Sequence, residues 1–219
     1  MSGGDLATKI EARRFVGREF LTWLWFESER SEGTLRTKPQ GELGLWIEQK
    51  LVLSFGKEIT QIKGKAPASA RDAKEALRVG KLPERAGLHV TLGDRDFSFE
   101  LRADTMALGA VALPAVLGKD DDEDGVVRFD DERKPRKKKP PRGADADDEQ
   151  REAFYERMHL VAELEAVVEA LFADFLALRL HDAWRTAVAP ALARFCAGEP
   201  IDEKRYAAAR SAALASRKR

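Results

Sequence analysis

The segment GREFLTWLWF, residues 17–26, places six large apolar side chains within ten positions near the start of the chain. These side chains recur at helical spacing and cover most of the circumference of a helix, so the helix needs packing partners on several sides. We therefore predict a helix over residues 5–31. Such a helix belongs in a protein core, and a subunit interface is the alternative. The residues assigned to this core or interface are Phe20, Trp23, Leu24 and Trp25.

Composition limits the classes of function that the chain can serve. The 219 residues include 38 basic and 38 acidic side chains, so attraction to nucleic acid must come from local clusters. Cys196 is the one cysteine, which excludes an intramolecular disulfide and fits a reducing compartment. The sequence has neither the apolar core of a signal peptide near its start nor an apolar run of roughly 18 residues. These features predict a cytoplasmic protein without a membrane span.

Alternating patterns after the first helix predict an antiparallel sheet. Residues 43–55 alternate apolar and polar side chains with a single break, as expected of a long bent strand. Residues 58–65 predict a second strand, a helix is expected over residues 69–79, and residues 88–92 and 97–101 predict a hairpin. The expected fold class is α+β, with an antiparallel sheet of about four strands packed against helices.

A charged segment divides the sequence. Residues 119–149 carry alternating blocks of acidic and basic residues with several prolines, and such a composition predicts a disordered linker. The expected organisation is an α+β domain at 1–118, the linker at 119–149, a long helix packing on that domain at 150–198, and a basic C-terminal helix or tail at 199–219.

The long helix after the linker has an apolar seam. Phe154, Val161, Val168 and Phe175 recur every seven residues, and further apolar positions widen the stripe beyond a coiled-coil seam. This width favours packing on the sheet domain, and a dimeric coiled coil is the alternative. Pro190 predicts a break or kink near the end of the helix.

Motifs for catalysis or metal binding are missing from the sequence. His89, His159 and His181 are scattered, and His89 is expected at an exposed or edge position of its strand. The sequence contains no CxxC, no HExxH and no glycine-rich phosphate loop. We therefore expect no enzymatic activity, no metal and no cofactor.

The strongest local charge is the segment RKPRKKKPPR, residues 133–142. Its side chains can pair with phosphates and release counterions, which gives binding that depends on salt but not on base sequence. The alternative is a solvated linker whose cations pair with neighbouring acidic residues. The candidate DNA-binding residues of this segment are Arg133, Lys134, Arg136, Lys137, Lys138, Lys139 and Arg142.

Three elements of the sequence together carry a resemblance to a known family. They are VGREFLTWLWFESE at 16–29, the succession EITQIKGK, AKEALRVGK, LHVTL and FSFEL, and MHLVAELEAVVEALFADFL at 158–176. In this order they resemble the tryptophan-rich helix, the succession of strand, helix and hairpin, and the C-terminal helix of the recombination-associated RdgC proteins of bacteria. The resemblance covers residues 16–118 and 154–180 and includes no counterpart of the family's N-terminal half.

This resemblance implies a DNA-binding function. RdgC proteins are non-catalytic, form homodimeric rings, bind double-stranded DNA without marked sequence preference and restrain strand exchange by RecA. The implied partners are therefore double-stranded DNA, a second copy of the chain and, indirectly through DNA, a RecA-type recombinase at the nucleoid. Lys63, Lys65 and Lys81 fall in matching segments and are the implied phosphate contacts.

Two other functions remain open from the sequence. The first is a protein-interaction module that docks through its apolar helices without touching DNA. The second, more distant, is a hydrolase with a dispersed carboxylate site.

Overall fold

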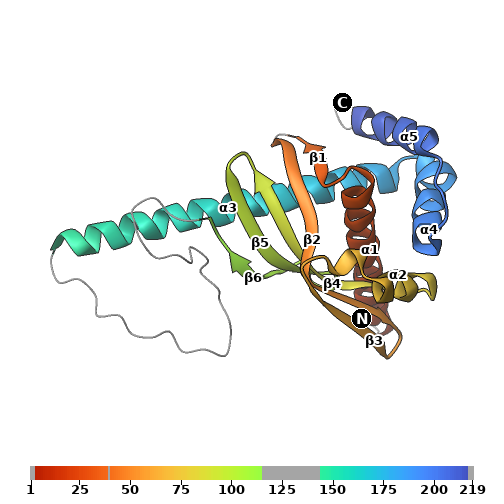
Figure 1. Ribbon diagram of the computed structural model, residues 1–219, viewed down its shortest axis with the longest axis horizontal. Coiled ribbons are helices and arrows are strands. Elements are labelled where there is room, and N and C mark those ends of the chain that lie inside the picture. The colour runs from red at the N-terminus through yellow and green to blue at the C-terminus, as the bar shows by residue number, and fades with distance from the viewer. Residues whose placement is uncertain (1–2, 39, 115–143, 217–219) are drawn as a thin grey trace.

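The computed structural model describes residues 3–38, 40–114 and 144–216. Helices and strands together form an α+β fold with a six-stranded antiparallel sheet. Figure 1 shows how these elements are arranged. The helices are α1 (Gly3–Arg30), α2 (Arg71–Arg78), α3 (Ala144–Leu180), α4 (Ala189–Ala197) and α5 (Glu203–Ser216). The strands are β1 (Thr34–Thr37), β2 (Gly41–Phe55), β3 (Glu58–Gly64), β4 (Leu82–Leu92), β5 (Arg95–Arg102) and β6 (Leu108–Ala112).

The predicted fold class is confirmed, but the predicted number of strands is too low. The two additional strands are β1 and β6, which have four and five residues. Strands this short carry too little alternation to be recognised from sequence, and each is defined by pairing with a longer neighbour. β1 pairs with β2, and β6 pairs with β5.

The sheet is organised around β2. The strand order is β1-β2-β4-β5-β6, and β3 pairs with the second half of β2. A bulge divides β2 at Gln49, which has a φ of 62°, and the register with β4 shifts between Ile47 and Leu51. Gly87 of β4 allows this bulge, because a Cβ at Gly87 would lie 2.3 Å from the carbonyl oxygen of Glu48. The single break in the alternating pattern of residues 43–55 is therefore a β-bulge.

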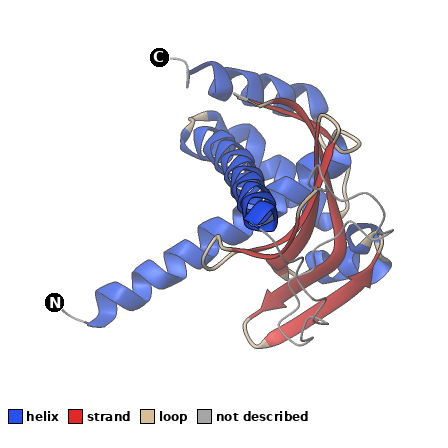
Figure 2. Cartoon of the chain, turned by 90° about the vertical axis from the view of Figure 1, so that its left-hand side faces the viewer, coloured by secondary structure: helices blue, strands red, loops and turns tan. Residues whose placement is uncertain are grey.

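One face of the sheet forms the core. Figure 2 shows the sheet curving around α1 and α3, with α3 seen nearly end-on on the concave side. The helix α1 approaches the sheet so closely that a Cβ at Gly17 would lie 1.9 Å from the carbonyl oxygen of Ala103. Strand residues that contribute fully buried side chains are Leu45, Leu51, Leu53, Val90 and Leu101.

The tryptophan-rich helix has packing partners on several sides. On one side, the rings of Phe20 and Trp23 lie 5.4 and 5.8 Å from the ring of Phe175 on α3. On another side, Trp25 meets Phe195 of α4 at 5.8 Å. The four residues assigned to the core or an interface are all buried within one chain, which favours the core: Phe20, Trp23, Leu24 and Trp25.

The long helix begins earlier and ends earlier than expected. Residues 144–149, expected in the linker, already belong to α3, whereas residues 115–143 lie outside the described part of the chain. The helix ends at Leu180, where the Nδ1 of His181 accepts a hydrogen bond from the backbone N–H of Ala183 at 3.1 Å. A π-helical turn at Trp184–Val188 then leads into α4.

Near the break or kink expected at Pro190, the π-helical turn ends at Val188 and α4 begins at Ala189. Pro190 lies in the first turn of α4, where a missing backbone N–H costs no helical hydrogen bond. Upstream, Leu164 and Phe175 of α3 are fully buried, but Phe154 is exposed, because this part of α3 projects beyond the sheet (Figure 1). Among the helices of the described residues, none is long and apolar enough to cross a membrane.

Candidate nucleic-acid interface

Four cationic side chains gather on the sheet face opposite the core. Lys50 of β2 precedes the buried Leu51, so its side chain points to the other face. Lys63 pairs with Lys50, and Arg85 pairs with Arg102 in the β4–β5 register. Val52 links the two pairs, because it lies two residues after Lys50 and opposite Arg85. We call Lys50, Lys63, Arg85 and Arg102 the basic cluster.

One carboxylate, Glu100 of β5, joins three members of the basic cluster. Its oxygens lie 2.6 Å from Lys50 Nζ, 3.9 Å from Arg85 Nη1 and 3.6 Å from Arg102 Nε. The side chain of Glu100 is only 13% exposed, whereas those of Arg85 and Arg102 are 45% and 46% exposed. The carboxylate therefore lies beneath the cations and leaves their outer sides open to solvent.

The cluster has the dimensions and charge of a phosphate-binding surface. Its members come from the four adjacent strands β3, β2, β4 and β5, so it spans roughly 14 Å at the usual strand spacing. Three of the four cations share one carboxylate and Lys63 lies beside Lys50, so the cluster has a local excess of positive charge in a chain whose formal net charge is zero. Lysine and arginine side chains held in this way can contact successive phosphates.

The three implied phosphate contacts have different surroundings. Lys63 belongs to the basic cluster, and Lys65 is exposed just after β3. Lys81 has protein partners instead: its Nζ lies 3.2 Å from Glu58 and donates a hydrogen bond to Thr60 at 3.1 Å. Its side chain is 15% exposed, so Lys81 is poorly placed to contact DNA. The basic segment 133–142 lies outside the described residues.

His89 lies in a polar row on the same face as the basic cluster. Its ring nitrogens lie 3.1 Å from Ser98 Oγ and 3.3 Å from Asp96 Oδ1, and Trp46 lies beside the ring. Thr91 donates a hydrogen bond to Asp96 at 2.6 Å. His89 is half-buried on a strand with neighbours on both sides, so the expected exposed or edge position is wrong.

This row arises from the pairing of β4 with β5. His89 faces Ser98, and Thr91 faces Asp96, across the hairpin. Cross-strand polar pairs of this kind stabilise an exposed sheet face. No group of three His, Cys, Asp or Glu side chains within the described ranges is arranged to hold a metal ion.

Sequence reasoning missed Lys50, Arg85 and Arg102. The hairpin turn at Gly93 and Asp94 sets the β4–β5 register, which already places Arg85 opposite Arg102. The position of Lys50 depends on the bulge in β2 and on pairing with β4, for which the sequence contains no local signal.

Comparisons of the chain with protein-family models, with curated proteins and with solved structures find no match.

Proposed function

We propose that this protein binds double-stranded DNA without sequence preference and without catalysis, in a recombination- or nucleoid-associated role in the cytoplasm. The observation that carries the proposal is the basic cluster, in which Lys50, Arg85 and Arg102 surround one partly covered carboxylate and Lys63 lies beside Lys50. The resemblance of several segments to RdgC proteins points to the same function. A second copy of the chain and, through DNA, a RecA-type recombinase are part of this proposal.

The proposed contact is with phosphates rather than bases. The cluster lies on a sheet face, and phosphate contacts position a protein on DNA without reading its sequence. Glu100 lies beneath Lys50 and the two arginines, so it neutralises part of their charge while their outer sides stay open to phosphates. Each phosphate neutralised releases counterions, so affinity should fall steeply with salt.

The test is fluorescence anisotropy with a random-sequence duplex over a range of salt concentrations. In the variant, Lys63→Gln and Arg102→Gln remove two cations from the cluster. We expect weaker binding and a salt slope shallower by about 2, because each phosphate that the protein neutralises adds roughly 0.9 to the slope. Arg36→Gln with Arg205→Gln is the matched control, because both arginines are exposed and lie outside the cluster. Equal affinity of the two double variants would refute contact through the sheet face.

A second pair of measurements separates the cluster from the basic segment. Replacing the seven cations of residues 133–142 with serine tests the contribution of the basic segment alone. If both surfaces contact DNA, each variant loses part of the salt slope and the combined variant loses both parts. Binding that depends on the segment alone would leave the sheet face without a role.

One observation favours a protein-interaction module as the second candidate. The part of α3 that projects beyond the sheet exposes Phe154, Tyr155 and Met158 at 58%, 58% and 52% (Figure 1). A clustered apolar patch of this kind is typical of a docking surface. Partner binding through it would be nearly indifferent to salt, whereas DNA binding would not. Absence of duplex binding at low salt would favour this candidate.

A further inference from the structure

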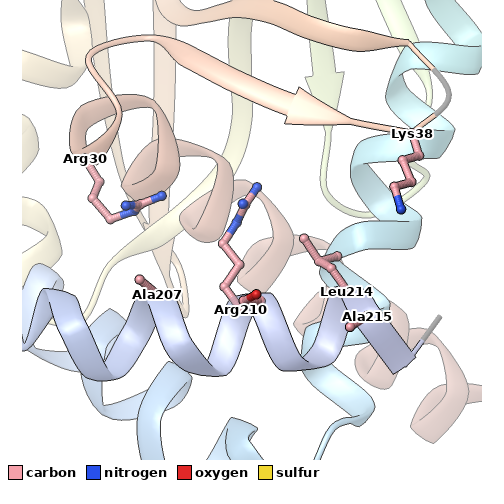
Figure 3. Close-up of a pocket in the computed structure, with 7 residues that line it drawn as sticks. Arg30, Lys38, Ala207, Arg210, Leu214 and Ala215 are labelled. Carbon is pink, nitrogen blue, oxygen red and sulfur yellow. The ribbon is translucent and has the colours of Figure 1, made fainter. Parts of the chain in front are cut away.

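A second cationic site lies away from the basic cluster, between α5, the last turn of α1 and the chain just after β1. Figure 3 shows this pocket, which has a volume of about 340 Å³. Volumes from about 300 Å³ upward are usual for small-molecule sites. The lining residues are Arg30, Lys38, Ala207, Arg210, Ser211, Leu214 and Ala215.

The charged residues that line the pocket are basic. Among the described residues, the lining contains three cations and one hydroxyl but no carboxylate, although the whole chain has as many acidic as basic residues. Most of it comes from α5, where lining positions recur at intervals of three and four residues and so share one face of the helix. This face combines Arg210 and Ser211 with the apolar Leu214. The pocket therefore suits a small anion that also has an apolar part.

A buried network holds the two arginines of the pocket. Glu27 is fully buried and accepts hydrogen bonds from the hydroxyl of Tyr206 and, at 2.9 Å, from Nη2 of Arg30. Trp23 donates a hydrogen bond to the oxygen of Tyr206 at 3.0 Å. The guanidinium of Arg30 also lies over the ring of Tyr206, 5.2 Å from its centre. Arg30 is thus fixed from two sides, by the carboxylate and by the ring.

Arg210 has weaker contacts with carboxylates than Arg30 has. Its Nε lies 3.6 Å from Glu27, beyond hydrogen-bond distance, and that carboxylate already has two donors. Within the described part of the chain, the Nε atoms of Arg30 and Arg210 are buried without hydrogen-bond partners. Arg30 has a second, half-exposed carboxylate neighbour in Glu203 at 3.6 Å, whereas the carboxylate found beside Arg210 among the described residues is Glu27.

We propose that this pocket binds a small ligand through an oxyanion, either a phosphate or a carboxylate. Arg210 provides the main charge-assisted hydrogen bonds, and the hydroxyl of Ser211 and the cations Arg30 and Lys38 complete the polar wall. Leu214 contacts the apolar part of the ligand. The proposal does not depend on DNA binding, because none of the lining residues belongs to the basic cluster.

The test is isothermal titration of the full chain with inorganic phosphate and, separately, with succinate. Loss of charge-assisted hydrogen bonds costs about 1.5–3 kcal/mol, so Arg210→Gln should weaken binding roughly tenfold to a hundredfold. Arg205→Gln is the matched control, because Arg205 is an exposed arginine on the same helix and does not line the pocket. It should bind like the unchanged protein. Binding of phosphate or of succinate identifies which oxyanion the site accepts.

Two results would overturn the proposal. The first is that the unchanged protein binds neither probe at millimolar concentration. The second is that Arg205→Gln and Arg210→Gln weaken binding equally, which would indicate diffuse attraction to α5. If thermal unfolding shows that Arg210→Gln does not fold, Lys38→Gln on the opposite wall replaces it, with the same expected direction and the same control.

Discussion

The two faces of the sheet are built from the same strands, yet they differ in burial and in charge. Lys50 and Leu51 are neighbours in β2, but Leu51 is fully buried and Lys50 lies in the basic cluster. The inner face is closed by α1 and α3, so its side chains determine stability. The arginines of the cluster on the outer face are nearly half exposed, so this face can carry charge for binding. Function and stability should therefore respond to different substitutions on alternate residues.

Substitution of two tryptophans, one in the core beneath the inner face and one on the outer face, should give the largest difference in stability. Trp23 on α1 is fully buried against Phe175, whereas Trp46 on the outer face is 38% exposed. Trp23→Ala should lower the free energy of unfolding by about 3–5 kcal/mol, because it leaves a large cavity and removes the donor to Tyr206. Trp46→Ala should lower the free energy of unfolding by about half as much or less. Denaturant unfolding measures both, and equal losses would contradict the division between the faces.

A glycine substitution tests how closely α1 approaches the sheet. Gly17→Ala should lower the free energy of unfolding by about 1–3 kcal/mol, because the new Cβ meets the carbonyl oxygen of Ala103 and forces α1 outward. Gly109→Ala in β6 is the control, since its Cβ would come no nearer than 3.9 Å to the carbonyl oxygen of Glu100. A harmless Gly17→Ala would mean that α1 is not seated on the sheet at this point.

The buried network beneath α5 should make stability depend on pH. Burial raises the pKa of Tyr206, and the Glu27 carboxylate raises it further. In the folded state, Tyr206 therefore keeps its hydroxyl proton at pH values above about 10, where an unfolded tyrosine loses it. The resulting stabilisation is complete below about pH 10 and is lost as pH rises toward the higher folded pKa, by up to about 1.4 kcal/mol per pH unit.

Thermal unfolding between pH 9 and 11 measures this dependence. Tyr206→Phe should be less stable at neutral pH, because Glu27 loses a donor, but should lose less further stability above pH 10. Tyr155→Phe is the matched control, since Tyr155 is exposed on α3, and should keep the slope of the unchanged protein. Identical slopes for all three proteins would show that Tyr206 does not hold its proton in the folded state.

Local patterns in the sequence predicted much of the inner face. The helical spacing around Trp23 and the alternation around Leu51 and Val90 depend only on neighbours in sequence, and all three residues are buried. The bulge at Gln49 appeared in the sequence as a broken alternation, although its cause, close contact with Gly87, lies on another strand.

The outer face was harder to predict because charge carries no periodic signal of its own. Of the cluster, Lys63 was identified through a resemblance, whereas Lys50 required knowledge of which strands flank β2. The ion pair of Lys81 could not be predicted for a related reason: its partner Glu58 is 23 positions away in the sequence and becomes a neighbour only in the fold. The π-helical turn and Tyr206 network likewise depend on tertiary contacts.

Glu100 gives the smallest expected change in stability and the sharpest test of the outer face. Glu100→Gln removes the shared partner of Lys50, Arg85 and Arg102, and because these cations keep contact with solvent the free energy of unfolding should fall by about 1 kcal/mol or less. Affinity for duplex DNA should rise at the same time, since the carboxylate no longer competes with phosphates. A several-fold gain in anisotropy titrations at constant salt, with Glu42→Gln at the exposed start of β2 unchanged, is the expected result. Lower affinity would instead mean that Glu100 is needed to position the cations, and unchanged affinity would mean that DNA does not contact this face.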